Sequence, residues 1–301
     1  MRILLLGRNG QVGWELQRAL APLGELVALD RHGGQGLCGD LADLDALAAT
    51  VRTIAPDAIV NAAAYTAVEK AESEPELALR INGEAPGVLA REAARLGAWL
   101  VHYSTDYVFD GSGEQPWWED APTGPLSVYG RTKLAGEQAI AAVGAQALVL
   151  RTSWVYAARG GNFARTMLRL AGEREQLRVI ADQIGAPTGA ELIADVTAHL
   201  LRRVCGVKEA SGLSGTYHLA ATGETSWCDY ARFVLEQAAQ RGVVLKAGAA
   251  QIEAIPTSAY PTPASRPLNS RLATDKLRTT FGLHLPHWQD GVARMLTEIL
   301  E

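Results

Sequence analysis

Cysteine is scarce in this sequence: the 301 residues contain only Cys38, Cys205 and Cys228, which lie far apart. A disulfide framework or a zinc site needs cysteines in closely spaced pairs, so an odd and scattered set favours neither. So few cysteines are typical of proteins from a reducing compartment. We therefore expect a cytoplasmic protein.

Long apolar runs and basic clusters are also missing. The N-terminal run at 3–6 ends at Gly7, too early for a signal peptide, and no run reaches the ~18 residues of a membrane-spanning helix. The net charge is -5, and no stretch is rich in lysine or arginine. We therefore expect no membrane segment, no nucleic-acid partner and a low-molecular-weight substrate.

Hydrophobic residues make up 48% of the chain, which is enough for a large buried core. In the first half, short apolar segments alternate with amphipathic ones, and one predicted helix is interrupted near Pro86. This alternation predicts an α/β protein with a doubly wound, Rossmann-like parallel sheet, because right-handed crossovers place helices on both faces. The expected strands are 2–6, 25–30, 58–61, 99–103 and 147–151, and the expected helices are 11–21, 43–54, 76–96 and 126–143.

The pattern is less regular after residue 153. Four prolines stiffen the segment 256–267, which we expect to be an ordered loop. We predict a dinucleotide-binding domain over 1–153 and a smaller C-terminal substrate domain over 154–301, with some segments returning to the sheet. The expected elements of this half are helices at 163–174, 190–204 and 227–241 and a strand at 216–220.

Glycines follow the first predicted strand and open the first helix. Glycine allows a tight turn with positive φ and a close approach of the backbone to a pyrophosphate, and the helix N-terminus offers free N–H groups to the phosphates. The spacing is G-x-x-G-x-x-G rather than G-x-G-x-x-G, so a purely structural turn stays an alternative. The predicted pyrophosphate site consists of Gly7, Gly10, Gln11, Val12 and Gly13.

An acid ends the second predicted strand. Asp30 lies 17 residues after Gly13, where a carboxylate binds the hydroxyls of the adenine-side ribose. Arg31 follows directly and tolerates a 2′-phosphate, so the sequence leaves NADH and NADPH both open. The same end of the sheet is expected to hold Asp40 and Leu41 near the adenine ring, and Ala62, Ala63 and Ala64, whose small side chains let a cofactor lie close.

Tyr129 and Lys133 are four residues apart, which places them on one face of a predicted helix, one turn apart. This arrangement suits reduction of a ketone, because a tyrosine donates a proton more readily when an ammonium group stabilises its anion. A surface pair on a helix is the alternative for such spacing alone. The polar run 104–107 supports the catalytic interpretation, since it follows a strand at the edge where parallel sheets bind ligands.

Seven blocks of the sequence match a known family: 7–13, 60–68, 104–111, 129–133, 151–156, 182–188 and 266–270. Through these blocks the chain resembles the dTDP-4-dehydrorhamnose reductase family of extended short-chain dehydrogenases nearly end to end. The block containing Trp154 and the block 183–188 look specific to this family, whereas the first, third and fourth blocks are shared with other sugar-nucleotide enzymes.

The resemblance implies NAD(P)H-dependent reduction of the 4-keto group of dTDP-4-dehydro-β-L-rhamnose to dTDP-β-L-rhamnose, the last step of dTDP-L-rhamnose biosynthesis. Thr105 matches the family's serine/threonine position, Tyr129 matches the proton donor, and Lys133 matches the residue that binds the nicotinamide ribose. Tyr65 matches a further cofactor position. The positions that match substrate contacts are Val68, Thr105, Asp106, Tyr107, Tyr129 and Trp154. Without the resemblance, a buried core tryptophan is the alternative for Trp154.

In some members of the resembled family, a magnesium ion lies at the interface of a homodimer and is held by glutamates from both chains. Glu15 and Glu191 match two of its ligands, but the third position is Gln289, with Asp290 one residue later. That offset turns a helical side chain by about 100°. We therefore expect a weak or absent magnesium site with no part in catalysis.

Two other functions fit the same pattern. A sugar-nucleotide epimerase or dehydratase shares the fold, although a dehydratase usually has an acidic pair where Tyr107 follows Asp106. A non-catalytic regulatory subunit, as of methionine adenosyltransferase, resembles the same family. The complete set of Thr105, Tyr129 and Lys133 favours an enzyme.

Overall fold

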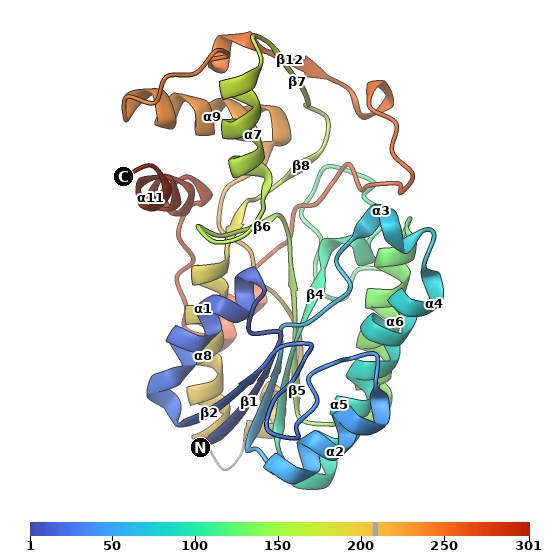
Figure 1. Cartoon of the computed structure of the whole chain (residues 1–301). Coiled ribbons are helices and arrows are strands. Elements are labelled where there is room, and N and C mark those ends of the chain that lie inside the picture. The colour runs from blue at the N-terminus through green and yellow to red at the C-terminus, as the bar shows by residue number, and fades with distance from the viewer. Residues whose placement is uncertain (207–209) are drawn as a thin grey trace.

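The computed structural model describes residues 1–206 and 210–301 and is built on a six-stranded parallel sheet (Figure 1). The strand order is β10-β5-β4-β3-β1-β2, so the chain reverses direction across the sheet between β1 and β3. A reversal of this kind opens a crevice at the carboxyl ends of the two strands, where such folds bind ligands. The strands are β1 (Arg2–Leu6), β2 (Glu25–Leu29), β3 (Ala58–Asn61), β4 (Trp99–Thr105), β5 (Ala147–Thr152) and β10 (Gly215–His218).

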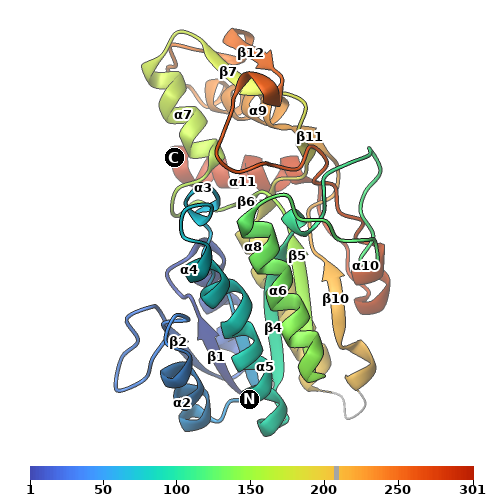
Figure 2. The same ribbon diagram turned by 90° about the vertical axis from the view of Figure 1, so that its right-hand side faces the viewer.

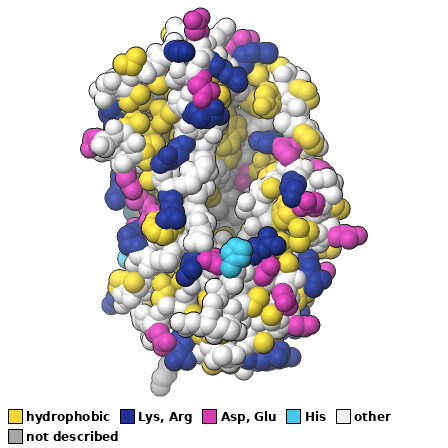
Figure 3. Space-filling model, viewed as in Figure 1, with side chains coloured by type: hydrophobic (Ala, Val, Ile, Leu, Met, Phe, Trp, Pro, Cys, Tyr) yellow, Lys and Arg dark blue, Asp and Glu magenta, His cyan; other side chains and the backbone are white. Residues whose placement is uncertain are grey.

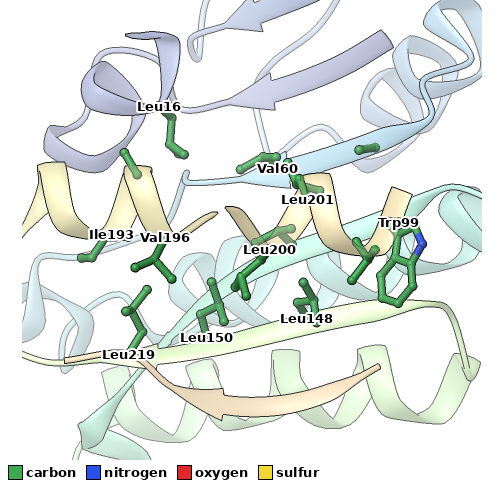
Figure 4. Close-up of a cluster of buried hydrophobic side chains, with 14 of the residues drawn as sticks. Leu16, Val60, Trp99, Leu148, Leu150, Ile193, Val196, Leu200, Leu201 and Leu219 are labelled. Atoms are coloured by element: carbon green, nitrogen blue, oxygen red, sulfur yellow. The ribbon is translucent and has the colours of Figure 1, made fainter. Parts of the chain in front are cut away.

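Helices cover both faces of this sheet, which explains why its central strands are almost wholly apolar. Along β1, Ile3 and Leu5 join the core under one helical layer, and Leu4 and Leu6 join the core under the other, since successive strand residues face opposite sides. The helices are α1 (Gln11–Leu20) and α8 (Ala190–Cys205) on one face, and α2 (Leu44–Ile54), α5 (Ala85–Leu96) and α6 (Val128–Val143) on the other. Figure 4 shows Leu200 of α8 close to Leu148 and Leu150 in the first of these cores, which also contains Leu16.

The helix predicted over 76–96 is broken earlier than expected. It divides into α4 (Pro75–Leu79), a π-helical turn at Arg80–Glu84, and α5. Pro86 has no N–H to donate, so a regular helix cannot continue through it unchanged. The wider turn just before it absorbs the mismatch, and the backbone N–H of Ala85 reaches back to the Arg80 carbonyl.

A second layer of structure lies beyond the carboxyl edge of the sheet (Figures 1 and 2). Its core contains Tyr230, Trp288 and Val292, all of them buried. Strands β7 and β12 pair in parallel beside it. The helices here are α7 (Phe163–Glu173), α9 (Trp227–Gln240) and α11 (Trp288–Leu300), and the strands are β7 (Leu177–Ile180) and β12 (Ile252–Ile255), with short pairs β6 (Val155–Tyr156) and β9 (Thr188–Gly189), and β8 (Ile184–Gly185) and β11 (Thr225–Ser226). In the sheet layer, α3 (Val68–Ala71) lies beside α4 and α6, and α10 (Asp275–Phe281) lies beside β10.

Two segments after residue 153 belong to the main sheet layer. Strand β10 pairs in parallel with β5, with Gly215 opposite Leu148, and helix α8 packs against α1. The sheet layer therefore contains residues from before and after residue 153. A domain boundary at residue 153 stays a prediction. Within the described residues, no helix is both long and apolar enough to cross a membrane.

Candidate active site

The glycine-rich turn after β1 leaves no room for side chains. Gly7 has φ +86°, and a Cβ there would lie 2.7 Å from the backbone nitrogen of Ala63. A Cβ on Gly13 would lie 2.0 Å from the Gly7 carbonyl oxygen. Gly10 caps α1 without a side-chain hydrogen bond, so the first N–H groups of the helix keep no side-chain partner. Gln11 and Val12 stand half-buried at this helix start, and the whole cradle fits the pyrophosphate of a dinucleotide.

The residues predicted for the adenine side gather next to this turn. Asp30 accepts hydrogen bonds from Arg8 (Nε, 3.1 Å), Asn9 (Nδ2, 3.0 Å) and the backbone N–H of His32 (2.9 Å). The His32 N–H is the main cause that lowers the Asp30 pKa, and Arg8 and Asn9 add to it. Arg8 and Asn9 were not predicted as part of this site, although both lie inside the glycine-rich turn.

Arg31 is exposed, and its guanidinium lies 3.2 Å from the carboxylate of Asp40. The Asp40 carboxylate also accepts from the backbone N–H of Ala42 at 2.9 Å, and Leu41 is buried beside it. An exposed ion pair of this kind contributes at most about 1 kcal/mol, so a phosphate can replace the carboxylate as the partner of Arg31.

The alanines that follow β3 are half-buried, and the next residue is held in place by a side chain from the π-helical turn. Tyr65 N–H donates to the Asn82 side-chain oxygen at 2.8 Å, and the Asn82 amide donates back to the Tyr65 carbonyl at 3.0 Å. The Tyr65 hydroxyl donates to Glu74 at 2.7 Å. Asn82 was missed at the sequence level, because its role depends on a contact 17 residues away. The alanines are Ala62, Ala63 and Ala64.

Strand β4 runs two residues further than the sequence indicated and carries Thr105 into the sheet, opposite Thr152 of β5. Asp106 then begins a 3-10 turn and is only 2% exposed. Thr105 Oγ1 donates to Asp106 Oδ1 at 2.9 Å and accepts from the Tyr107 N–H at 3.2 Å. Burial raises the pKa of Asp106 to about 6, although the Thr105 and Ser270 hydroxyls oppose the rise.

Tyr129 lies in the first turn of α6, which Ser127 caps by accepting from the Gly130 N–H at 3.2 Å. Its ring meets that of Tyr107 edge to face, with centroids 5.5 Å apart. Burial and the nearby Asp106 raise the Tyr129 pKa to about 12, with Thr105 acting in the opposite direction. Desolvation of the phenol is thus the main cause of the raised Tyr129 pKa, and a lowering of this pKa by Lys133 stays a prediction.

Lys133 is 2% exposed and lies one turn further along α6. Its Nζ donates to the Tyr103 carbonyl at 2.6 Å and lies 3.4 Å from His102 Nε2. Burial lowers the Lys133 pKa to about 8, while the Glu137 carboxylate raises it. The tyrosine, the lysine and Thr105 thus converge at the carboxyl end of β4, although two of them lie on a helix and one on a strand.

Trp154 follows β5 with a left-handed backbone, at φ +48°. Its indole stacks on Trp227 with ring centroids 3.7 Å apart, and Trp227 Nε1 donates to Gln183 at 3.1 Å. A Cβ on Gly185 would lie 2.8 Å from Trp154 and 3.1 Å from the side chain of Ser270, which acts on the pKa of Asp106. These contacts link Trp154 to the Thr105 site, and Trp227 is a part of the site that the sequence did not indicate.

Val68 begins α3 at the rim of the same site. The next residue, Glu69, accepts from Arg266 at 2.6 Å and from the Ala264 N–H at 2.9 Å. Arg266 in turn acts on the pKa of Tyr107, which burial raises. The face seen in Figure 1 is hollowed between the sheet layer and the second layer, with hydrophobic side chains along the rim (Figure 3).

The residues predicted for magnesium lie apart from this site. Glu15 is 3.4 Å from Arg18, and Glu191 is 3.4 Å from Arg294. Burial is the main cause that raises the Glu191 pKa, and Glu15 adds to it, so the two acids are neighbours. Gln289 and Asp290 are exposed at the start of α11. In residues 1–206 and 210–301, no cluster of three or more His, Cys, Asp or Glu side chains is arranged to hold a metal.

The doubly wound sheet, the glycine-rich turn after β1, and the tyrosine–lysine pair on the helix after β4 define an extended short-chain dehydrogenase. A solved UDP-glucose 4-epimerase from Thermus thermophilus has this fold, with a TM-score of 0.79 over 99% of each chain. At 20% identity that likeness concerns the fold alone.

A family model described as RmlD substrate binding domain matches residues 1–301. The dTDP-4-dehydrorhamnose reductase of Escherichia coli (strain K12) is 57% identical over 99% of this chain and 98% of its own. The reductase of Burkholderia thailandensis is 49% identical over 100% of this chain and 99% of its own. The chain belongs to this reductase family and is an NAD(P)H-dependent oxidoreductase.

Solved structures agree with this assignment. A dTDP-4-dehydrorhamnose reductase from Clostridium acetobutylicum ATCC 824 is 32% identical, with a TM-score of 0.89 and complete coverage of both chains. The reductase of Bacillus anthracis str. Ames, solved in complex with NADP, is 33% identical, with a TM-score of 0.86 over 99% of each chain.

Proposed function

We propose that the chain reduces the 4-keto group of dTDP-4-dehydro-β-L-rhamnose to dTDP-β-L-rhamnose with NADPH or NADH. The observation that carries the reductase chemistry is the convergence of Thr105, Tyr129 and Lys133 at the carboxyl end of β4. The choice of substrate is supported by 57% identity over nearly the whole length to a reductase named for it.

The residues of this chain handle the proton and hold the reactants. The nicotinamide, when bound, supplies the hydride. Tyr129 Oη gives its proton to the sugar oxygen, and Thr105 Oγ1 hydrogen-bonds the same oxygen. Lys133 Nζ holds the nicotinamide ribose and steadies the tyrosine anion that remains. The burial of Thr105 and Lys133, 5% and 2% exposed, keeps bulk water from competing for these bonds.

The remaining site residues are proposed as binding groups. The cradle at 7–13 and the segment 62–65 hold the dinucleotide, with Asp30 on the ribose hydroxyls and Arg31 available for a 2′-phosphate. The sugar lies against the free face of Trp154, since Trp227 covers the other face. The other proposed contacts to the sugar nucleotide are Val68, Asp106 and Tyr107.

Three broader features complete the proposal. A cytoplasmic location is supported by three scattered cysteines. A homodimer is compatible with the family, and magnesium is proposed to have no catalytic part, since hydride and proton transfer need no metal here. Glu15 and Glu191 already have arginine partners, which supports a weak or absent metal site.

A coupled assay tests the function. dTDP-glucose is converted by the upstream enzymes, and the purified chain is added alone, with NADPH and NADH compared. We expect oxidation of at least one cofactor and formation of dTDP-β-L-rhamnose. Turnover that requires a partner protein would favour a regulatory subunit, and a product formed without net cofactor oxidation would favour an epimerase.

A further inference from the structure

Three buried polar side chains form a line from the sheet to the helix α6. Two of them have no role in the proposed mechanism. Asn61 ends β3, His102 lies on β4, and Lys133 lies on α6; they are 1%, 1% and 2% exposed. Asn61 Nδ2 is 3.1 Å from His102 Nδ1, and His102 Nε2 is 3.4 Å from Lys133 Nζ. The imidazole therefore connects the end of one strand to the catalytic lysine.

The orientation of the Asn61 amide is set by a bond on its other side. Its Oδ1 accepts from the Ala63 N–H at 3.2 Å, so its NH2 group faces the imidazole. An NH2 group only donates, and His102 Nδ1 must accept from it. Burial lowers the His102 pKa well below its ordinary value, so the ring is neutral and carries its single proton on Nε2.

That proton points at Lys133. An ammonium group has only N–H donors and cannot accept it, whereas a neutral amine accepts it with its lone pair. The amine can at the same time donate to the Tyr103 carbonyl, 2.6 Å away. The neutral form of Lys133 thus satisfies both neighbours, and the charged form satisfies only one.

Other charged groups act on the same lysine. Glu137, one turn further along α6, favours the ammonium form. Its carboxylate is engaged by Arg151 of β5, through Nε at 3.0 Å and Nη2 at 2.7 Å, which reduces that effect. On the other side, Asp106 acts on the pKa of Tyr129. His102 is therefore the residue of the sheet whose Nε2–H directly disfavours the ammonium form of Lys133.

We propose that His102 is a positioning residue whose Nε2–H, fixed by Asn61, stabilises the neutral amine of Lys133 and so governs how readily Lys133 releases a proton. The effect on catalysis rests on the proposed function, whereas the contacts among Asn61, His102 and Lys133 do not. After Tyr129 has protonated the sugar oxygen, an N–H bond of the Lys133 ammonium breaks as the O–H bond of Tyr129 forms again, which leaves Lys133 as the neutral amine. Solvent water then returns a proton to Lys133.

Nitrogen NMR on the full chain, with and without bound NADP⁺, tests the tautomer without any turnover. The six histidines are labelled with ¹⁵N, and the His102 signals are those lost in His102→Gln. We expect an unprotonated Nδ1 and a protonated Nε2. A protonated Nδ1 would overturn the inference and leave the proposed function untouched, because the measurement uses no substrate.

The pH profile of kcat/KM tests the consequence. In His102→Gln the side-chain carbonyl can turn toward Lys133 and accept from the ammonium, so we expect the alkaline limb to move up by about one pH unit. The matched control is His218→Gln, another buried histidine of the same sheet, which should leave that limb in place. An unmoved limb in His102→Gln, with turnover preserved, contradicts the proposal; absence of turnover in the unaltered chain instead contradicts the proposed function.

Discussion

Thr105 Oγ1 directs its proton at the Asp106 carboxylate, 2.9 Å away. A hydroxyl has one proton, so Thr105 cannot donate to Asp106 and to a substrate oxygen at the same time. The second carboxylate oxygen, Asp106 Oδ2, is buried without a partner. A protonated Asp106 competes less strongly for this proton, which leaves the Thr105 hydroxyl freer to turn to a substrate oxygen.

The first prediction concerns stability and pH. The folded-state pKa of Asp106, about 6, lies above its ordinary value of 3.8, so its ionisation opposes folding. The contribution of Asp106 to stability is highest below pH 3.8 and is lost as pH rises through 6, by at most ~3 kcal/mol. The variant Asp106→Asn should not lose this stability as pH rises, because its amide does not ionise. Thermal unfolding from about pH 4 to 8 checks it, with Asp110→Asn on the exposed side of the same loop as the control.

Tyr129→Phe should fold normally and bind cofactor, because only one hydroxyl is removed. Its kcat should fall by about 10² to 10⁴, the usual share of a general acid. Tyr217→Phe is a matched control, since that buried hydroxyl bonds only the Leu213 carbonyl, far from β4's end. Near-normal turnover by pure Tyr129→Phe would remove this phenol from the mechanism.

Asp30→Ala should weaken NADH more than NADPH. The carboxylate that accepts from the ribose hydroxyls is lost, while Arg31 remains for a 2′-phosphate. The measurement is KM for each cofactor at fixed sugar nucleotide. Equal rises in the two KM values would show that Asp30 organises Arg8 and Asn9 rather than binding the ribose.

Trp154→Ala should raise KM for the sugar nucleotide and leave cofactor affinity unchanged. The stack on Trp227 leaves one indole face for the sugar, and the substitution removes that wall. Trp118→Ala, at a position 54% exposed, provides the control for loss of an indole. A lowered melting temperature with unchanged KM would assign Trp154 to the core.

Removal of metal should not affect turnover. Activity is compared with EDTA and with millimolar magnesium, and sedimentation is measured under the same conditions. We expect equal rates, and at most a weak effect of magnesium on association. A sharp magnesium-driven shift from monomer to dimer would show that Glu15 and Glu191 exchange their arginine partners for the ion.

Local patterns predicted the sheet well, because each strand is a short apolar run bounded by turn residues. The end of β4 was missed, since polar Thr105 joins the sheet only because Thr152 of β5 lies opposite. Helix α11 was also missed, although Val292, Met295 and Leu296 have the spacing of a helical face.

Site residues were predictable where a local sequence pattern marks them. They were not predictable where their role depends on contacts between distant segments of the chain. Tyr129 and Lys133 are evident from their spacing along a helix. Asn82, Trp227 and His102 are not, because each acts through a neighbour at least 17 residues away. The raised pKa of Tyr129 was not predicted either, because burial cannot be judged from spacing.

The place of β10 at the sheet edge has a consequence during translation. Five strands are complete once Thr152 has been synthesised, but Gly215 follows 63 residues later. At ~5–20 residues per second, a nascent chain spends roughly 3 to 13 seconds with β5 as an unpaired edge. Its free N–H and C=O groups can then pair with another chain. Over the same interval Leu148 and Leu150 await the helix α8 that covers them, so this stage of synthesis is the one at which a chaperone has most to protect.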